Sequence, residues 1–129
     1  MPYIKSTDYA RAARLPITAG ELNYAITLKI IEHLETGKSL IGFYGQILKL
    51  CESYINRRGL TYTIGNEVLG VIACAGHEAM RRCGDTQTVN WITAMLASVG
   101  NHIYDNILAP YEDGKIIENG DVYPRTLIV

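Results

Sequence analysis

Cysteine is scarce in this sequence, with three residues in a chain of 129. Cys51, Cys74 and Cys83 form neither an even set nor a CxxC pair, which excludes a disulfide framework and a zinc knuckle. Cys51 and Cys74 lie among leucine, isoleucine and alanine, so we expect both to be small buried side chains. No two of the three histidines have metal-ligand spacing, and we expect each to be an ordinary helix-face residue.

The sequence also lacks an excess of one charge and a long apolar run. Twelve Lys and Arg against 13 Asp and Glu give a net charge of −1, which is too little to hold a nucleic-acid duplex or an anionic membrane. No apolar run approaches the roughly 20 residues of a membrane span, and Lys5 and Asp8 interrupt any signal peptide. We therefore expect a soluble cytoplasmic protein that binds neither membrane nor duplex.

Motifs of common enzymes are missing as well. The sequence has no HExxH, no glycine-rich phosphate loop and no GxSxG. Four carboxylates fall between positions 112 and 121, but they lack the alternate spacing of a divalent-cation loop. We therefore predict no enzymatic activity, no metal and no cofactor.

What the sequence does contain predicts one all-α domain over residues 1–129, a compact bundle of four to five helices. Ser6 is a candidate cap for a short helix that ends before Pro16, and Thr18 with Glu21 forms a capping box. Apolar residues then recur at steps of three and four, and Pro110 is expected to end the last helix. The predicted longer helices span residues 19–36, 39–57, 61–83 and 86–108.

The C-terminal end is predicted to be a short irregular or β-prone tail. Asn119 to Asp121 has turn composition, and residues 126–129 are apolar and β-prone. Such an end must be covered, so we expect it to dock on its own bundle or on a second subunit. A homo-oligomer is expected, with a symmetric dimer as the favoured form.

Arginine pairs and tyrosines are the candidate binding groups. Arg57-Arg58 and Arg81-Arg82 each close a predicted helix, where they either neutralise the helix dipole or bind an anion. Nine tyrosines stand against one phenylalanine and one tryptophan, a skew that suits half-buried interfaces and base-stacking pockets. Both interpretations of the arginines remain open at this point.

Three segments resemble a known family: Met1-Pro2-Tyr3-Ile4, the block GELNYAIT at 20–27, and the block NGDVY at 119–123. They are similar to a family of small uncharacterised proteins of bacteriophages and bacteria, known as a domain of unknown function. In that pattern the double arginine lies just before the PYE word, whereas here about 27 residues separate Arg82 from Pro110.

The phage association implies a function by analogy. Phages encode small oligomeric proteins that sequester the nucleotide messengers of bacterial immunity, and a helical protein without a catalytic motif is similar in kind to these sponges. We therefore predict a non-catalytic protein that sequesters a nucleotide-like anion; the alternative is a helical adaptor that binds a host or phage protein without a small ligand. Arginine would bind phosphate, tyrosine would stack on a base, and the remaining groups would read polar edges. The predicted ligand-binding residues are Asn23, Tyr24, Arg81, Arg82, Tyr111, Lys115, Asn119, Asp121 and Tyr123.

Overall fold

The structure, a computed structural model, describes residues 4–36 and 40–120, and within these ranges it contains helices and no strand. The predicted all-α class is confirmed, and the four long helices agree with their predicted spans to within one residue up to Ile103. None of the helices in the described ranges has both the length and the apolar character needed to cross a membrane. The elements are η1 (Ser6–Asp8), α1 (Tyr9–Arg14), α2 (Ala19–Thr36), α3 (Leu40–Arg58), α4 (Tyr62–Arg82), α5 (Thr86–Ile103), η2 (Tyr104–Leu108) and α6 (Ala109–Asn119).

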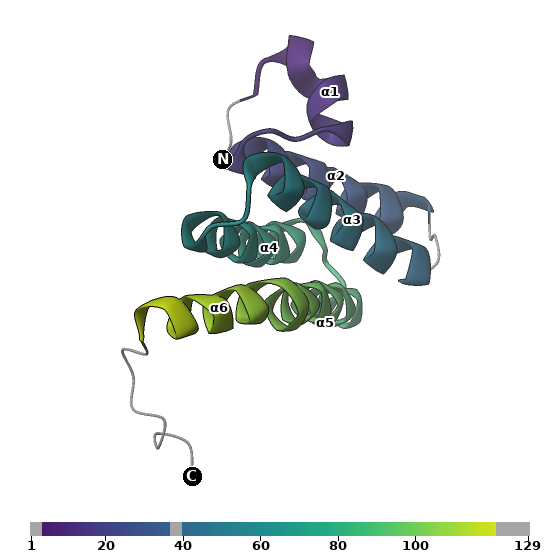
Figure 1. The fold of residues 1–129 in the computed structure, drawn as a ribbon. Helices are drawn as coiled ribbons and strands as arrows, with labels where there is room; N and C mark the ends of the chain where they lie inside the picture. The colour runs from purple at the N-terminus through teal and green to yellow at the C-terminus, as the bar shows by residue number, and fades with distance from the viewer. Residues whose placement is uncertain (1–3, 37–39, 121–129) are drawn as a thin grey trace.

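The long helices pack as a bundle in which α2 lies at the centre of the contacts. It packs against α1, α3 and α4, and α5 in turn packs against α3 and α4 (Figure 1). The chain then continues from α5 through η2 into α6, so that these three elements form one extended rod along the lower side of the view. The rod carries α6 to the end of the bundle opposite the α4–α5 turn.

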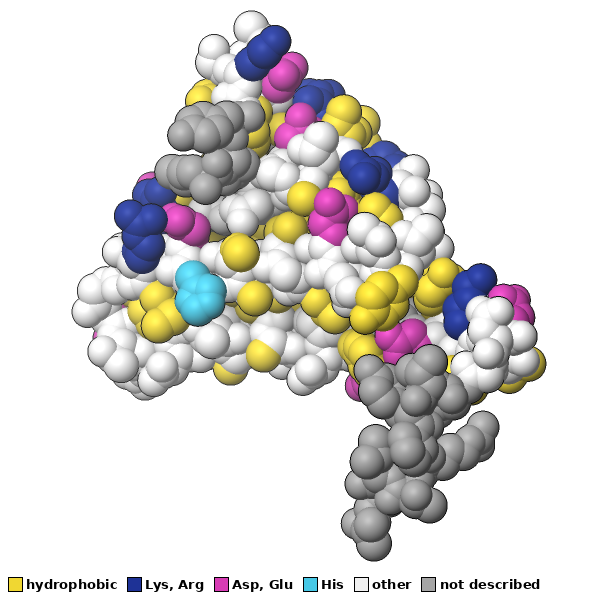
Figure 2. All heavy atoms as spheres, turned by 90° about the vertical axis from the view of Figure 1, so that its left-hand side faces the viewer, with side chains coloured by type: hydrophobic (Ala, Val, Ile, Leu, Met, Phe, Trp, Pro, Cys, Tyr) yellow, Lys and Arg dark blue, Asp and Glu magenta, His cyan; other side chains and the backbone are white. Residues whose placement is uncertain are grey.

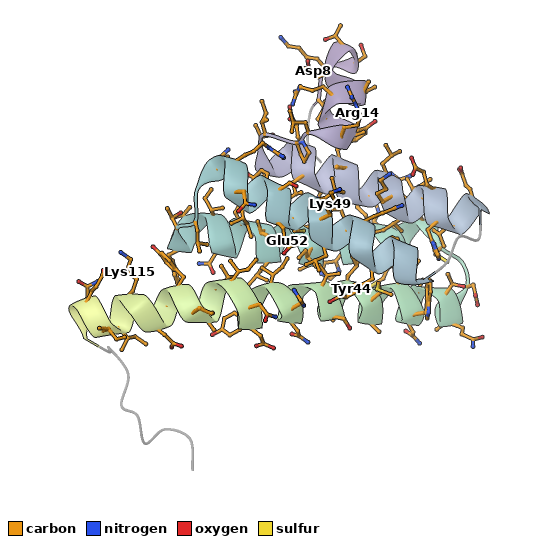
Figure 3. The ribbon with its side chains drawn as sticks, turned by 45° about the vertical axis from the view of Figure 1, so that its right-hand side comes forward. Asp8, Arg14, Tyr44, Lys49, Glu52 and Lys115 are labelled. Carbon is orange, nitrogen blue, oxygen red and sulfur yellow. The ribbon has the colours of Figure 1, made fainter. Side chains whose placement is uncertain are left out.

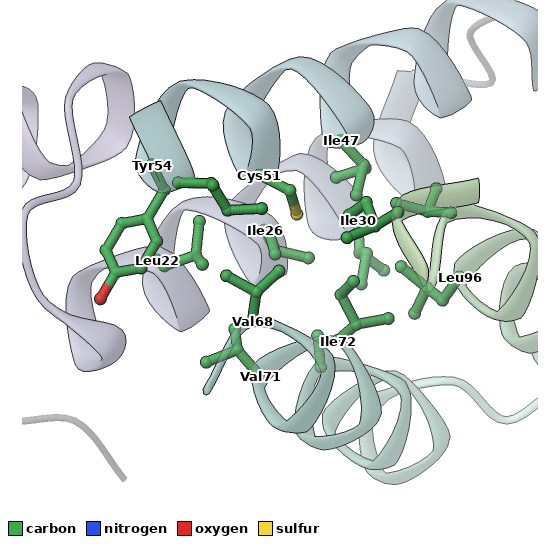
Figure 4. Packing of buried hydrophobic residues seen from close by; sticks show 14 of the residues in the cluster. Leu22, Ile26, Ile30, Ile47, Cys51, Tyr54, Val68, Val71, Ile72 and Leu96 are labelled. Atoms are coloured by element: carbon green, nitrogen blue, oxygen red, sulfur yellow. The ribbon is translucent and has the colours of Figure 1, made fainter. Parts of the chain in front are cut away.

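The core is built from the apolar stripes that the sequence predicts (Figure 4). On α4 all six expected positions are buried, whereas Cys74 is exposed, contrary to expectation. A helix turns by about 100° per residue, so position 74 points away from the stripe that carries Ile72 and Ala75. Cys51 is fully buried, and burial raises the pKa of its thiol to about 12. The buried residues on α4 are Ile64, Val68, Val71, Ile72, Ala75 and Ala79.

One expectation about helix ends is wrong: the helix does not stop at Pro110. The π-helical turn η2 precedes it, and there the N–H of Ala109 bonds to the carbonyl of Tyr104, five residues earlier. Pro110 then falls in the first turn of α6, where a helix tolerates proline because the missing N–H has no required partner. The segment after Pro110 is therefore helical to Asn119, and the predicted tail at 121–129 lies outside the described residues.

The caps explain where two helices begin. The N–H of Glu21 donates to Thr18 Oγ1 at 3.1 Å, as the capping box predicts, but the Glu21 carboxylate accepts from Ile17 N at 3.0 Å instead of from Thr18. Ser6 does not cap a helix with its side chain, because it is the first residue of the 3₁₀ turn η1. Thr61 caps α4 by accepting from Ile64 N.

Two glycines of α4 make a matched pair for testing this packing. A Cβ at Gly65 would lie 2.5 Å from Leu108 Cδ2, whereas a Cβ at Gly70 would meet nothing within 4 Å. Gly70→Ala is expected to raise the free energy of unfolding by about 0.5–1 kcal/mol, the usual helix-propensity gain. The free energy of unfolding of Gly65→Ala is expected to be at least about 1 kcal/mol lower than that of Gly70→Ala, because Leu108 must shift. Urea unfolding measures both, and equal stabilities would contradict the close contact between α4 and η2.

Candidate functional site

The predicted site residues on α2 serve a local contact. Tyr24 stacks on Tyr9 of α1 with ring centroids 5.5 Å apart and planes inclined by 20°. Asn23 Oδ1 accepts a hydrogen bond from Thr27 Oγ1 at 3.2 Å. Both residues therefore lie near the junction of α1 with α2. Each side chain already has a partner within the protein and needs no ligand to explain its position.

The arginine pair at the end of α4 is exposed and shares one acidic partner. Arg81 Nη1 lies 3.2 Å from Glu78 Oε1, and Arg82 Nε lies 3.3 Å from Glu78 Oε2. Surface ion pairs of this kind contribute little to stability, since water screens them. Both guanidinium groups therefore remain accessible to another anion.

The predicted residues on α6 form a third, separate group. Lys115 Nζ lies 5.6 Å from the centre of the Tyr111 ring and 3.2 Å from Glu118 Oε2, and Asn119 is exposed at the helix end. Figure 3 shows Lys115 at the far end of the rod. Asp121 and Tyr123 lie outside the described residues.

These groups do not meet within one chain in the described ranges. Tyr111 follows Thr86 by about 25 residues along α5, η2 and α6, which corresponds to a rise of roughly 37 Å. Because Thr86 follows the Arg81-Arg82 end of α4, the arginines and the α6 residues lie at opposite ends of the bundle (Figure 1). The structure thus leaves the arginines without the tyrosines expected beside them.

The other arginine pair has a structural role. Arg57 Nη2 donates to the carbonyl of Pro16 at 2.5 Å, and Arg58 Nη1 donates to the carbonyl of Ile17 at 2.9 Å. These bonds tie the end of α3 to the segment between α1 and α2. Their donors are engaged by backbone carbonyls, so this pair is the poorer candidate for binding an anion.

A pocket that the sequence did not reveal lies where α2 ends and α5 begins. It has a volume of about 360 Å³ and is lined by His33, Leu34, Asp85, Gln87, Thr88 and Trp91. We call it the His33–Trp91 pocket. The α5 side of the pocket is close to Arg82 in the sequence, because only Cys83 and Gly84 separate Arg82 from Asp85.

His33 is the unusual group of this pocket. Its ring packs against two aromatic rings, with centroid distances of 4.9 Å to Trp91 and 5.0 Å to Phe43. The residue is only 9% exposed, and its Nδ1 is buried with no hydrogen-bond partner among the described residues. A buried polar atom without a partner is unfavourable by about 1–3 kcal/mol. His33 is therefore not the ordinary helix-face residue that we expected.

The polar edge of the pocket is set by the cap of α5. Asp85 accepts from Thr88 Oγ1 and, at 3.2 Å, from Thr88 N. The hydrogen bond from the Thr88 side chain is the main cause that lowers the pKa of Asp85, so its carboxylate is ionised at neutral pH. The pocket therefore offers a negative acceptor beside the ring of His33. In the described part of the chain, no three His, Cys, Asp or Glu side chains gather as a metal site requires.

One signal in the sequence could have pointed to His33. It follows Ile26 by seven residues and Ile30 by three, so it falls on the apolar stripe of α2 that faces the core. A histidine in such a position is either buried with a partner or available to a ligand. The contact between His33 and Trp91 could not be predicted, because 58 positions separate the two residues in the sequence.

Comparison with known proteins places the chain in a family and does not assign an activity. Residues 1–122 match the model of a family described as Domain of unknown function (DUF6899), and the chain belongs to this family. No curated protein and no solved structure matches the chain.

Proposed function

We propose that the protein is a non-catalytic binding protein that sequesters a small nucleotide-like ligand, with the base of that ligand held in the His33–Trp91 pocket. The observation that carries this proposal is a pocket lined by Trp91, the ionised Asp85 and His33, whose buried Nδ1 has no hydrogen-bond partner among the described residues. Because Nδ1 itself is buried, the His33 ring must turn for a ligand to reach it, and the hydrogen bond then formed would remove an unfavourable feature of the free protein. The phage setting and the sponge role rest on the family resemblance.

The chemistry of the pocket favours a flat heterocycle. About 360 Å³ lies at the small end of the range of ligand pockets, roughly 300–1,000 Å³, and suits a single base. The indole of Trp91 offers a stacking surface, and Gln87 offers an amide that can read a base edge. The ionised Asp85 carboxylate accepts hydrogen bonds only, so it selects a ring edge with N–H donors.

The phosphate of such a ligand would lie outside the pocket, because the Asp85 carboxylate repels it. Arg82 is the nearest cation along the chain, and Arg81 adjoins it. Their shared partner Glu78 holds them only by exposed ion pairs. A phosphate can replace that carboxylate, since guanidinium forks bind phosphate oxygens by charge-assisted hydrogen bonds.

His33→Phe tests the pocket because it keeps the aromatic packing and removes the ring nitrogens. We expect nucleotide affinity to fall at least about tenfold, the loss of roughly one hydrogen bond. We also expect thermal stability to stay equal or rise, because the unpartnered Nδ1 is gone. Calorimetric titration and thermal unfolding measure the two effects. His102→Phe, which changes a histidine outside the pocket, is the matched control and should bind as the parent does.

The arginines supply a second test of the same proposal. Arg82→Ala should weaken binding of nucleoside phosphates by about ten- to a hundredfold, the equivalent of roughly 1.5–3 kcal/mol, while leaving nucleoside binding nearly unchanged. Arg57→Ala is the control for binding, since its guanidinium contacts Pro16. A parent protein that binds no nucleoside or nucleotide would contradict the proposal, and chromatographic detection of turnover would contradict its non-catalytic part.

The helical adaptor remains the second candidate function. It requires that the apolar groove between α4 and α5, which shares no residue with the His33–Trp91 pocket, receive a different protein and not a second copy of this chain. Figure 2 shows side chains of both charge signs interspersed on the face that it views, without a broad patch of one sign. A protein partner held through apolar contacts fits such a surface better than a polyanion does.

A further inference from the structure

The groove between α4 and α5 is apolar and open to solvent. It has a volume of about 490 Å³, and none of its lining residues is Lys, Arg, Asp or Glu. Gly76, Ala97 and Gly100 give it a shallow floor, with Met80 near one end and Tyr104 at the other. Met80 is 53% exposed, an unusual state for a large apolar side chain. We call this surface the α4–α5 groove.

The two ends of the groove differ in net charge. Arg81 follows the lining residue His77 by four positions, so it lies on the same face of α4 and is exposed. At the other end Tyr104 Oη lies 3.5 Å from Glu112 Oε2. The negative charge of Glu112, with smaller contributions from Asp105 and Asp113, raises the pKa of Tyr104. Where α4 ends, Arg81 and Arg82 share the single carboxylate of Glu78 and leave an excess of positive charge, whereas the groove is acidic where α5 passes into α6.

We propose that the α4–α5 groove is the interface of a symmetric homodimer, in which a second copy of this chain lies antiparallel across it. A twofold axis in the plane of the interface and perpendicular to the groove brings the Arg81 end of one copy to the Glu112 end of the other. The small side chains of the floor let the helix backbones approach closely, and Met80 of each copy is covered by the partner. A twofold along the groove would instead bring like charges together.

Residues 121–129 of the same copy are a poorer occupant of the groove. Gly120 lies 16 residues beyond Tyr104 along η2 and α6, a rise of roughly 24 Å. Residues 121–129 can span at most about 30 Å when fully extended. They could therefore cover only the Tyr104 end within one chain and would leave Met80 exposed.

Two alanines on α5 provide the test. Ala97 lines the groove, whereas Ala94 is exposed three positions earlier and does not line it. Ala97→Glu would place two like charges close to the twofold axis. In sedimentation velocity at micromolar concentration, we expect the parent and Ala94→Glu to have twice the mass of the 14.3 kDa chain and Ala97→Glu to have the mass of one chain. Circular dichroism checks that both variants keep the helical fold.

Charge reversal then tests the orientation. Arg81→Glu alone and Glu112→Arg alone should each weaken dimerisation at least about tenfold at low salt, and an equimolar mixture of the two variants should regain it in part. A monomeric parent would overturn the proposal, and so would an Ala97→Glu variant that remains dimeric. If the parent is monomeric and residues 121–129 fill its own groove, deleting these residues should lower its stability. That result would also overturn the dimer.

Discussion

Replacing Ile26 by alanine is expected to lower the free energy of unfolding by about 3–4 kcal/mol, the usual effect of truncating a large side chain in a close-packed core. Ile26 is fully buried at the centre of α2, the helix that contacts α1, α3 and α4 (Figure 4). The cavity left behind is bordered by rigid helices that cannot close around it. Urea unfolding followed by circular dichroism measures the loss.

Ile117→Ala is the matched control for this change. Ile117 is 85% exposed on α6, so the same truncation should alter stability by less than about 0.5 kcal/mol. Similar losses for the two variants would contradict the packing of α2 at the core.

Acid is expected to weaken the attachment of α1 to the bundle through Glu21. Its two carboxylate oxygens accept from Arg11 at 2.6 and 2.7 Å, and this hydrogen bonding is the main cause that lowers the pKa of Glu21 below its usual 4.5. A carboxyl with a lowered pKa in the folded state stabilises the fold fully above its ordinary pKa. That contribution is lost as the pH falls through the folded value, below about 4.5.

Glu21→Gln removes the charge and keeps the size of the side chain. We expect it to lower stability at pH 7 by about 1.5 kcal/mol, the low end for charge-assisted bonds because Arg11 is partly exposed to solvent. The difference between parent and variant should shrink as the pH falls below 4.5. Glu35→Gln, an exposed change on the same helix, should have little effect at either pH. A Glu21→Gln loss that does not vary with pH would contradict the ion pair.

The helices could be predicted because their signals are local. Thr18 with Glu21 marks the start of α2, and steps of three and four mark the buried faces of α2 to α5. The rule that proline ends a helix failed at Pro110, since it takes no account of a π turn that places the proline in a new first turn. A π turn leaves no pattern in the sequence that reasoning from periodicity could find.

The candidate site could not be predicted to the same extent, because it depends on which helix ends meet. Arg57-Arg58 and Arg81-Arg82 look alike in sequence, yet one pair bonds to carbonyls of residues 16 and 17 while the other stays exposed. The distinction arises from tertiary packing. In the same way His33 and Trp91 become a pocket only because the end of α2 packs near the start of α5.

A fluorescence titration of the parent protein tests directly whether the His33–Trp91 pocket binds a nucleotide-like ligand. Trp91 is the only tryptophan of the chain, so its emission reports on the His33–Trp91 pocket without a label. Nucleosides and nucleoside phosphates are added in turn, with matched ribose phosphate as the control for charge alone. We predict saturable quenching by at least one base-bearing ligand, with one ligand per chain, and no quenching by ribose phosphate. Emission that is unchanged by every nucleoside and nucleotide would contradict this prediction.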